Sequence, residues 1–260
     1  SDNDTLTYLH ACISAKRHPV RTPFTPMYID ALLADSALVG GLAPVLGGAA
    51  LRLVSVNGFP PMTEPGLLSD LDALGFDYRW ATRFIPLDKT DAEKQLTRRR
   101  RQWFALRKSF LTILKETLEN APAALVNTDA DIKAADVDAA LQSLGAGHVG
   151  FGYMTTTIAL LHAEADIADD RARAIERVLN ARGFSAIIES ANAVDAWFGT
   201  HPGNSYANVR QSLIHTLNLA HMAPLAAVWA GPEDNAHLAA PALIMARSTA
   251  NTPFRLVTHQ

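Results

Sequence analysis

The sequence has little of what disulfide-bonded and membrane-spanning proteins require. Cys12 is its only cysteine, so no disulfide can form within the chain, which suits a reducing compartment. The apolar neighbours of Cys12 predict a buried thiol. No apolar run reaches the roughly 18 residues that span a bilayer, and the richest, 220–230, is interrupted by Pro224. The first residues also show no signal-peptide pattern.

Motifs for metal, nucleotide and nucleophile chemistry are also missing. The nine histidines form no HExxH motif, and the nearest pair, His215 and His221, would lie on different helix faces, so no zinc site is expected. The glycines of 145–152 precede a strand instead of opening a helix, unlike a dinucleotide fingerprint. Neither a P-loop nor a nucleophile elbow occurs. We therefore expect no catalytic, cofactor-binding or metal-binding residues and no cofactor in this chain.

Positive charge is concentrated at one place in a chain whose formal net charge is −3. Arg98, Arg99, Arg100 and Arg101 stand together, and Trp103 follows. Four guanidinium groups beside an aromatic ring could contact nucleic-acid phosphates and bases. However, four consecutive helical residues point around most of the helix circumference, which favours a solvated face or one that meets an acidic partner. These five residues are candidate interaction residues under either interpretation.

The order of helical and strand-like patterns predicts an α+β fold. Strands are expected at 50–57, 76–87, 148–162 and 184–190, with short helices at 64–74 and 166–182 between them. They form two strand-helix-strand units of a mixed sheet. The periodic run 88–120 and the segment 129–144 predict a long projecting helical hairpin, and 241–249 with 252–259 a β-hairpin. A first helix is expected over 4–14, capped by Asp4 or Thr5.

The segment Ala191–Leu219 combines a helix-like run, a Pro-Gly break and a second apolar run. Its large apolar side chains are expected in the core, and Asn204 in a turn. The apolar residues concerned are Trp197, Phe198, Leu213, Ile214 and Leu217.

Several stretches, in order along nearly the whole chain, resemble the TrbE and VirB-type conjugal-transfer ATPases of type IV secretion. They include DTLTYLHACIS, PGLLSDLDALGFDYRWATRF and NTPFRL, and above all the segment from Asn192 to Pro232. Within that segment Pro202, Gly203, Asn204 and the VRQ around Arg210 carry the match, as does TLNLAHM at 216–222. None of these motifs is catalytic.

The resemblance implies a fragment of a longer protein that ends before a P-loop ATPase domain. On this basis we expect an α/β N-terminal-type domain at 1–200, with lobes 1–122 and 123–200. Residues 201–260 would form a junction and a β-hairpin leading to the motor, with Pro202, Gly203, Asn204 and Arg210 as candidate junction residues. ATP and Mg²⁺ are implied for the parent protein only, and the fragment is expected to be inactive alone.

The family implies a role in assembly at the bacterial inner membrane. Family members energise pilus biogenesis and transfer of DNA or protein, and the expected location is cytoplasmic, peripherally associated with that membrane. The expected partners are other secretion subunits and further copies of the parent. Two alternatives remain. One is a nucleic-acid-binding module that uses the Arg98–Arg101 helix. The other is a free-standing enzyme, although the sequence shows no set of residues typical of an active site.

Overall fold

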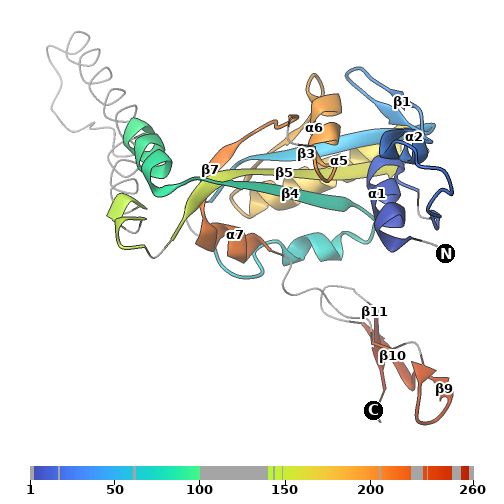
Figure 1. The fold of residues 1–260 in the computed structure, drawn as a ribbon. Helices are drawn as coiled ribbons and strands as arrows, with labels where there is room; N and C mark the ends of the chain where they lie inside the picture. Colours follow the sequence, from blue (N-terminus) through green and yellow to red (C-terminus); the bar gives the residue numbers. More distant parts are fainter. Residues whose placement is uncertain are drawn as a thin grey trace, which may run out of the picture. The chain divides into compact units, whose positions relative to one another are not determined.

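A computed structural model describes residues 3–16, 18–60, 63–99, 140–142, 144–147, 149–204, 206–223, 231–232, 234–247 and 253–257 (Figure 1). Its helices are α1 (Asp4–Ser14), α2 (Ile29–Leu33), the 3-10 helix η1 (Ser69–Leu74), α5 (Ala165–Ala181), α6 (Ala193–Gly199) and α7 (Thr216–Met222). Residues 89–99 are also helical. Its strands are β1 (Leu38–Val39), β2 (Val45–Leu46), β3 (Ala49–Gly58), β4 (Arg79–Pro86), β5 (Phe151–His162), β6 (Ser185–Ile188), β7 (Ser212–His215), β8 (Asp234–Asn235), β9 (Ala240–Pro241), β10 (Ile244–Arg247) and β11 (Pro253–Leu256).

A seven-stranded sheet organises these elements, in the order β1-β2-β3-β5-β4, with β6 also paired to β3 and β7 to β5. Strand β3 is antiparallel to β5 from Ala50↔His162 to Val56↔Thr156, and antiparallel to β6 at Val54↔Ile188. Strands β5 and β6 are therefore parallel, with β3 between them and α5 connecting them. This is the second predicted strand-helix-strand unit, and the α+β class is confirmed.

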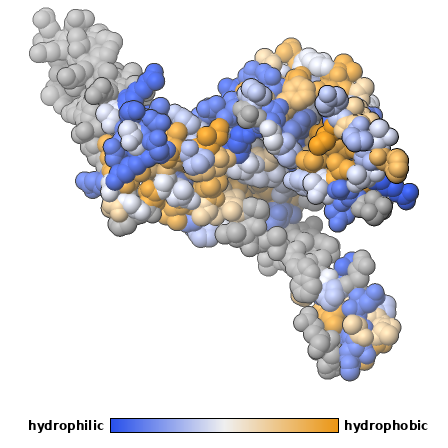
Figure 2. All heavy atoms as spheres, viewed as in Figure 1, coloured by the Kyte–Doolittle hydropathy of each residue, from blue (hydrophilic) through white to orange (hydrophobic). Residues whose placement is uncertain are grey.

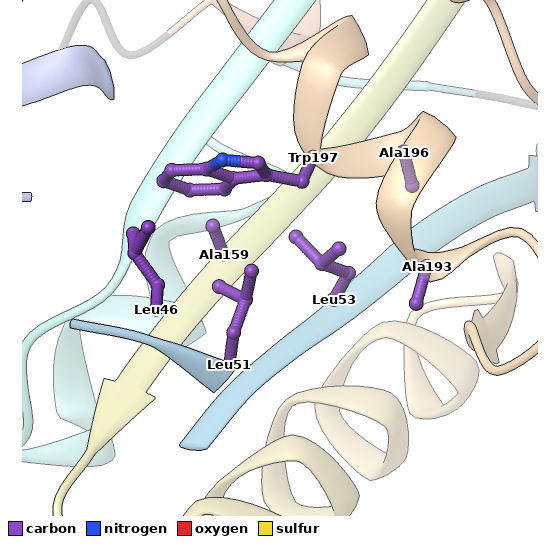
Figure 3. Packing of buried hydrophobic residues seen from close by; sticks show 7 residues of the cluster. All are labelled: Leu46, Leu51, Leu53, Ala159, Ala193, Ala196 and Trp197. Carbon is purple, nitrogen blue, oxygen red and sulfur yellow. The ribbon is translucent and has the colours of Figure 1, made fainter. Parts of the chain in front are cut away.

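Strand β3 is buried on both faces because a helix covers each of them. Leu51 and Leu53 point to α6, where they pack against Trp197 (Figure 3). On the opposite face Arg52 donates a hydrogen bond to Asp169 of α5, and α5 packs along β3 and β6. Because Trp197 is 1% exposed, its truncation to alanine is expected to cost about 3–5 kcal/mol.

Helix α5 shows how the sequence pattern produces this layer. Its buried residues are spaced four, three and four apart, as on one stripe of a helix: Ala168, Ala172, Ile175 and Leu179. After the helix the chain turns at Gly183, whose φ of 83° favours glycine. The N–H of Phe184 then donates to the carbonyl of Leu179 at 3.1 Å, which satisfies a group that the helix end leaves unpaired.

The described residues divide into two units. The first comprises 1–83, 154–212 and 220–260, and the second 84–153 and 213–219. In the second unit a small core forms from Ala92, Leu96, Leu144 and Phe151. Residues 89–99 and some of 140–145 are its helical stretches, but 100–139 lie outside the described residues, so the long hairpin and the lobe boundary at 122 stay predictions, as do the domains 1–200 and 201–260.

Several local expectations need correction. The cap of α1 is Asn3, whose side chain accepts from the N–H of Leu6 at 3.1 Å, instead of Asp4 or Thr5. The helix expected at 64–74 shortens to η1. Phe198 and Leu217 are 38% and 50% exposed instead of buried, whereas Trp197 and Ile214 are in the core as predicted. Cys12 is buried, and β10 and β11 pair antiparallel as the predicted hairpin.

None of the described helices combines the length and the apolar content needed to cross a membrane.

Candidate functional site

The segment that runs from the last residue of α6 towards β7, residues 199–210, is called here the junction segment. Gly203 has a φ of 80°, where side chains with a Cβ are strained. The side-chain Oδ1 of Asn204 accepts hydrogen bonds from the N–H groups of Tyr206 at 3.0 Å and Ala207 at 3.3 Å. Asn204 therefore forms the turn that its residue type predicted.

Arg83 of β4 holds the junction segment to the sheet. One guanidinium nitrogen, Nη1, donates to the carbonyl of Ala207 at 2.6 Å. The other, Nη2, donates to the carbonyl of Gly199 at 3.1 Å and to that of Asn204. Three carbonyl groups of an irregular loop thus gain a charged donor, and hydrogen bonds to charged groups are stronger than neutral ones.

Arg79, four residues earlier on β4, supports the start of the same segment. Its guanidinium donates to the Thr200 hydroxyl and to the Cys12 carbonyl. Its Cζ also lies 4.5 Å from the centre of the Trp197 ring, within cation–π range. Burial lowers the pKa of Arg79. The Arg79 guanidinium therefore contacts α1, α6 and the loop that follows α6, and it links these three elements.

Burial, and then the nearby positive charge of Arg79, lower the pKa of His201 from 6.5 to about 4. The imidazole also packs edge-on against Trp197, with ring centres 5.0 Å apart. At neutral pH His201 is therefore uncharged.

Arg210 closes the other end of the junction segment through a two-point ion pair with Glu189. Its Nε lies 3.0 Å from Oε1 and its Nη2 3.2 Å from Oε2 of that carboxylate. The Glu189 side chain is 1% exposed and that of Arg210 is 32% exposed. Hydrogen bonding to Glu189 raises the pKa of Arg210. Its backbone φ is 60°, which is unusual for a residue other than glycine.

A groove of about 530 Å³ runs along the junction segment. Its walls combine one carboxylate, two aromatic rings and backbone; the lining residues are Asp195, Phe198, Gly203, Asn204, Tyr206, Ala207, Asn208 and Val209. Tyr206 is 96% exposed. On the face shown in Figure 2, hydrophobic residues also reach the surface where α6 and β1 lie. An open groove with exposed aromatic rings is suited to a protein segment.

The basic cluster is only partly described. Arg98 and Arg99 are exposed at the end of the helical stretch 89–99, whereas Arg100, Arg101 and Trp103 lie outside the described residues. The interaction role of these five residues stays a prediction. So does the junction role of Pro202, Gly203, Asn204 and Arg210, although the structure brings all four into one segment.

Sequence reasoning missed Arg79, Arg83 and Glu189, on which the geometry of the junction segment depends. A signal existed for the arginines, because the alternation in β4 places both on one face of the strand. Two arginines on one face of a strand next to a core require carbonyl or carboxylate partners. The sequence did not reveal that those partners lie between 67 and 124 positions away along the chain.

Comparisons with known proteins connect this chain to one family. Residues 115–210 match the model of the CagE, TrbE, VirB family, described as a component of the type IV transporter system. A relative from Sinorhizobium fredii, named as the second portion of a probable conjugal transfer protein TrbE, is 36% identical over 99% of this chain and 38% of its own length. The conjugal transfer protein TrbE of Rhizobium radiobacter is 34% identical over 99% of this chain and 31% of its own length. The chain thus spans about a third of the curated relatives that it matches.

Proposed function

Because the chain belongs to the CagE, TrbE, VirB family of type IV transporter components, we propose that it is an assembly and regulatory domain of a conjugal-transfer ATPase. In this proposal it mediates self-association of the parent protein and its docking to other secretion subunits at the bacterial inner membrane. The parent protein energises pilus biogenesis and transfer by hydrolysing ATP with Mg²⁺, and the domain lies on the cytoplasmic side, peripherally attached.

One observation carries the proposal: the similarity covers 99% of this chain but only about a third of each TrbE relative. The chain therefore matches about a third of the length of each of these relatives. Its groove adds support, because Phe198 and Tyr206 present aromatic surface beside a segment that Arg83 and Arg210 hold in place. A preorganised surface loses less conformational entropy when a partner binds.

The first experiment tests the groove in the full-length parent protein. Tyr206→Glu places a charge on the exposed rim of the groove without touching the core. We expect reduced co-purification of other transfer-system subunits and unchanged nucleotide binding. Tyr28→Glu is a matched control, because Tyr28 is also a strongly exposed tyrosine, at 84%, and does not line the groove. Equal subunit recovery from both variants and the unmodified protein would contradict docking through the groove.

The second experiment tests the basic helix and separates the nucleic-acid alternative. The charge reversal Arg98→Glu with Arg99→Glu is compared with Lys89→Glu and Lys94→Glu on the same helical stretch. If the arginines meet an acidic protein surface, the first pair alone weakens oligomer formation. If the arginines contact DNA, the unmodified protein shifts the mobility of single-stranded DNA, and this shift disappears as the salt concentration rises. The arginine charge reversal should then abolish the shift. Unchanged assembly in all variants contradicts a role for this helix in self-association.

A last measurement concerns catalysis. The chain of 260 residues, purified alone, is expected not to hydrolyse ATP above a protein-free blank, while the full-length parent does. Appreciable ATP turnover by the isolated chain would contradict the proposal that it is an assembly and regulatory domain without ATPase activity of its own.

A further inference from the structure

Three potential metal ligands meet at the N-terminal end of the fold. His10 lies on α1, His18 on the loop after it, and Asp35 just beyond α2. One ligand atom from each lies within 4.8 Å of the other two. His10 Nε2 is 3.2 Å from Asp35 Oδ1, and the two imidazole rings are 4.3 Å apart between centres.

These separations are compatible with one shared ion. Zinc takes nitrogen and oxygen ligands at about 2.0–2.2 Å in a tetrahedron, so two of its ligands lie roughly 3.3–3.5 Å from each other. The pair His10 and Asp35, at 3.2 Å, lies just below this spacing. The ligand atom of His18 lies within 4.8 Å of the other two, and its ring is exposed, so it can rotate toward them.

The backbone that carries these ligands is held in place. The N–H of Asn3 donates to the carbonyl of Val20 at 2.8 Å, and the N–H of Val20 donates to the Thr7 hydroxyl at 2.9 Å, which ties the loop of His18 to α1. The Ser36 hydroxyl donates to the carbonyl of Ser14 at 3.3 Å, which ties the segment of Asp35 to the end of α1. Preorganised ligands lower the cost of metal binding.

A partner for the imidazole of His10 is also present. The Ser14 hydroxyl lies 3.0 Å from Nε2 and 3.4 Å from Nδ1 of the buried ring, and it donates to the His10 carbonyl at 2.8 Å. This contact holds the ring in place, and an ion bound at Nε2, which faces Asp35, would displace the hydroxyl from that nitrogen.

An ion pair already involves the carboxylate, since Lys16 Nζ lies 3.2 Å from Asp35 Oδ2. This contact uses one oxygen and leaves Oδ1, which faces His10.

We propose that His10, His18 and Asp35 bind one divalent transition-metal ion of the zinc class, with water in the fourth position. Two imidazoles and one carboxylate favour such an ion over Mg²⁺ or Ca²⁺, which prefer oxygen ligands alone. The ion joins α1, its following loop and the segment after α2. The sequence did not reveal this site because its ligands come from three separate segments with no short motif.

The test uses the whole 260-residue chain, stripped with EDTA and titrated with Zn²⁺ against a chromophoric chelator. We expect one equivalent of high-affinity binding and a rise in Tm on adding Zn²⁺. His18→Ala and Asp35→Asn should each lower the affinity by more than about tenfold and abolish the rise in Tm. His237→Ala, an exposed histidine outside the cluster, should behave as the unmodified chain.

Co²⁺ provides a second readout, because its visible spectrum distinguishes tetrahedral nitrogen and oxygen ligation from the hydrated ion. Far-UV circular dichroism of the stripped variants separates loss of ligands from loss of fold, and His18 is well suited because it is exposed. The proposal is overturned by the absence of saturable Zn²⁺ binding in the folded, unmodified chain. Binding that survives both His18→Ala and Asp35→Asn at unchanged affinity overturns it equally.

Discussion

Removing Arg210 leaves the Glu189 carboxylate buried without its cation. Breaking a fully buried ion pair from one side costs about 3–5 kcal/mol. Glu189 is 1% exposed but Arg210 is 32% exposed, so water can reach some of the space that alanine leaves. We therefore expect Arg210→Ala to lower the free energy of unfolding by about 2–3 kcal/mol, measured by urea denaturation at pH 7.

The backbone of Arg210 supplies an internal comparison. At a φ of 60°, a residue with a Cβ is disfavoured by about 1 kcal/mol relative to glycine. Arg210→Gly removes the same ion pair but relieves this strain, so it should destabilise the fold by about 1 kcal/mol less than Arg210→Ala. Glycine also gains freedom in the unfolded chain, which makes this difference an upper estimate.

The double variant Glu189→Leu with Arg210→Met tests whether the loss comes from the unpaired charge. Replacing both partners with apolar residues of similar volume is often nearly neutral. We expect the double variant to be more stable than Arg210→Ala alone. The reasoning is refuted if Arg210→Ala costs less than about 0.5 kcal/mol, or if the double variant loses as much as the single one.

Three further predictions use the same denaturation assay. Gly203→Val should lower the free energy of unfolding by about 1–2 kcal/mol, because the φ of 80° strains a β-branched residue. An added Cβ meets no atom within 4 Å, so the cost would come from the backbone. Gly203→Asn should cost less, and equal costs for the two variants would contradict a backbone origin. Gly152→Ala should lower the free energy of unfolding by more than about 2 kcal/mol, because its Cβ would lie 2.5 Å from the Ile85 carbonyl oxygen. A Cβ at Gly145 would have no atom within 4 Å, so Gly145→Ala should be within about 0.5 kcal/mol of the unmodified chain. The pKa of His201 falls from 6.5 in the unfolded chain to about 4 in the fold, so the unfolded chain binds more protons between these values and stability drops as pH falls from about 6.5 to about 4. After allowing for solvent screening, this loss of stability is about 2 kcal/mol. It should be absent in His201→Gln. Parallel stability-versus-pH profiles of the two chains would contradict this role of His201.

The periodic elements could be read from the sequence because their signals are local. Strand β3 lies one residue beyond each predicted end of 50–57, and α5 lies one residue from the predicted 166–182. Alternation and helical spacing each depend on neighbours within a few positions. Phe198 and Leu217 were placed wrongly in the core for a related reason, since hydrophobicity alone does not show which side of a short helix another element covers.

The strand order, the short strand β7 and the contacts of the junction segment could not be read in this way. Strand β3 lies between β5 and β6, an order set by long-range packing. Strand β7 has only four residues, too few for alternation to separate a strand from a helix. Arg83 meets carbonyl groups that lie 116 to 124 positions further along the chain.

The residues that carried the family resemblance in the junction segment have physical reasons for their types. Gly203 occupies a backbone conformation that favours glycine, and Asn204 caps the turn after it with its own side chain. Arg210 has a φ of 60°, and its guanidinium pairs with the carboxylate of Glu189, whose side chain is 1% exposed. Arg83 holds the segment at Gly199, Asn204 and Ala207, and Glu189 holds its end at Arg210. The exposed ring of Tyr206 therefore lies in a stretch that these two residues fix in place. Loss of either set of contacts should therefore weaken partner recovery in the same direction as Tyr206→Glu, through mobility of the groove instead of loss of contact surface. Hydrogen exchange distinguishes the two mechanisms: the amides of 199–210 should exchange faster in Arg210→Ala and at the unmodified rate in Tyr206→Glu.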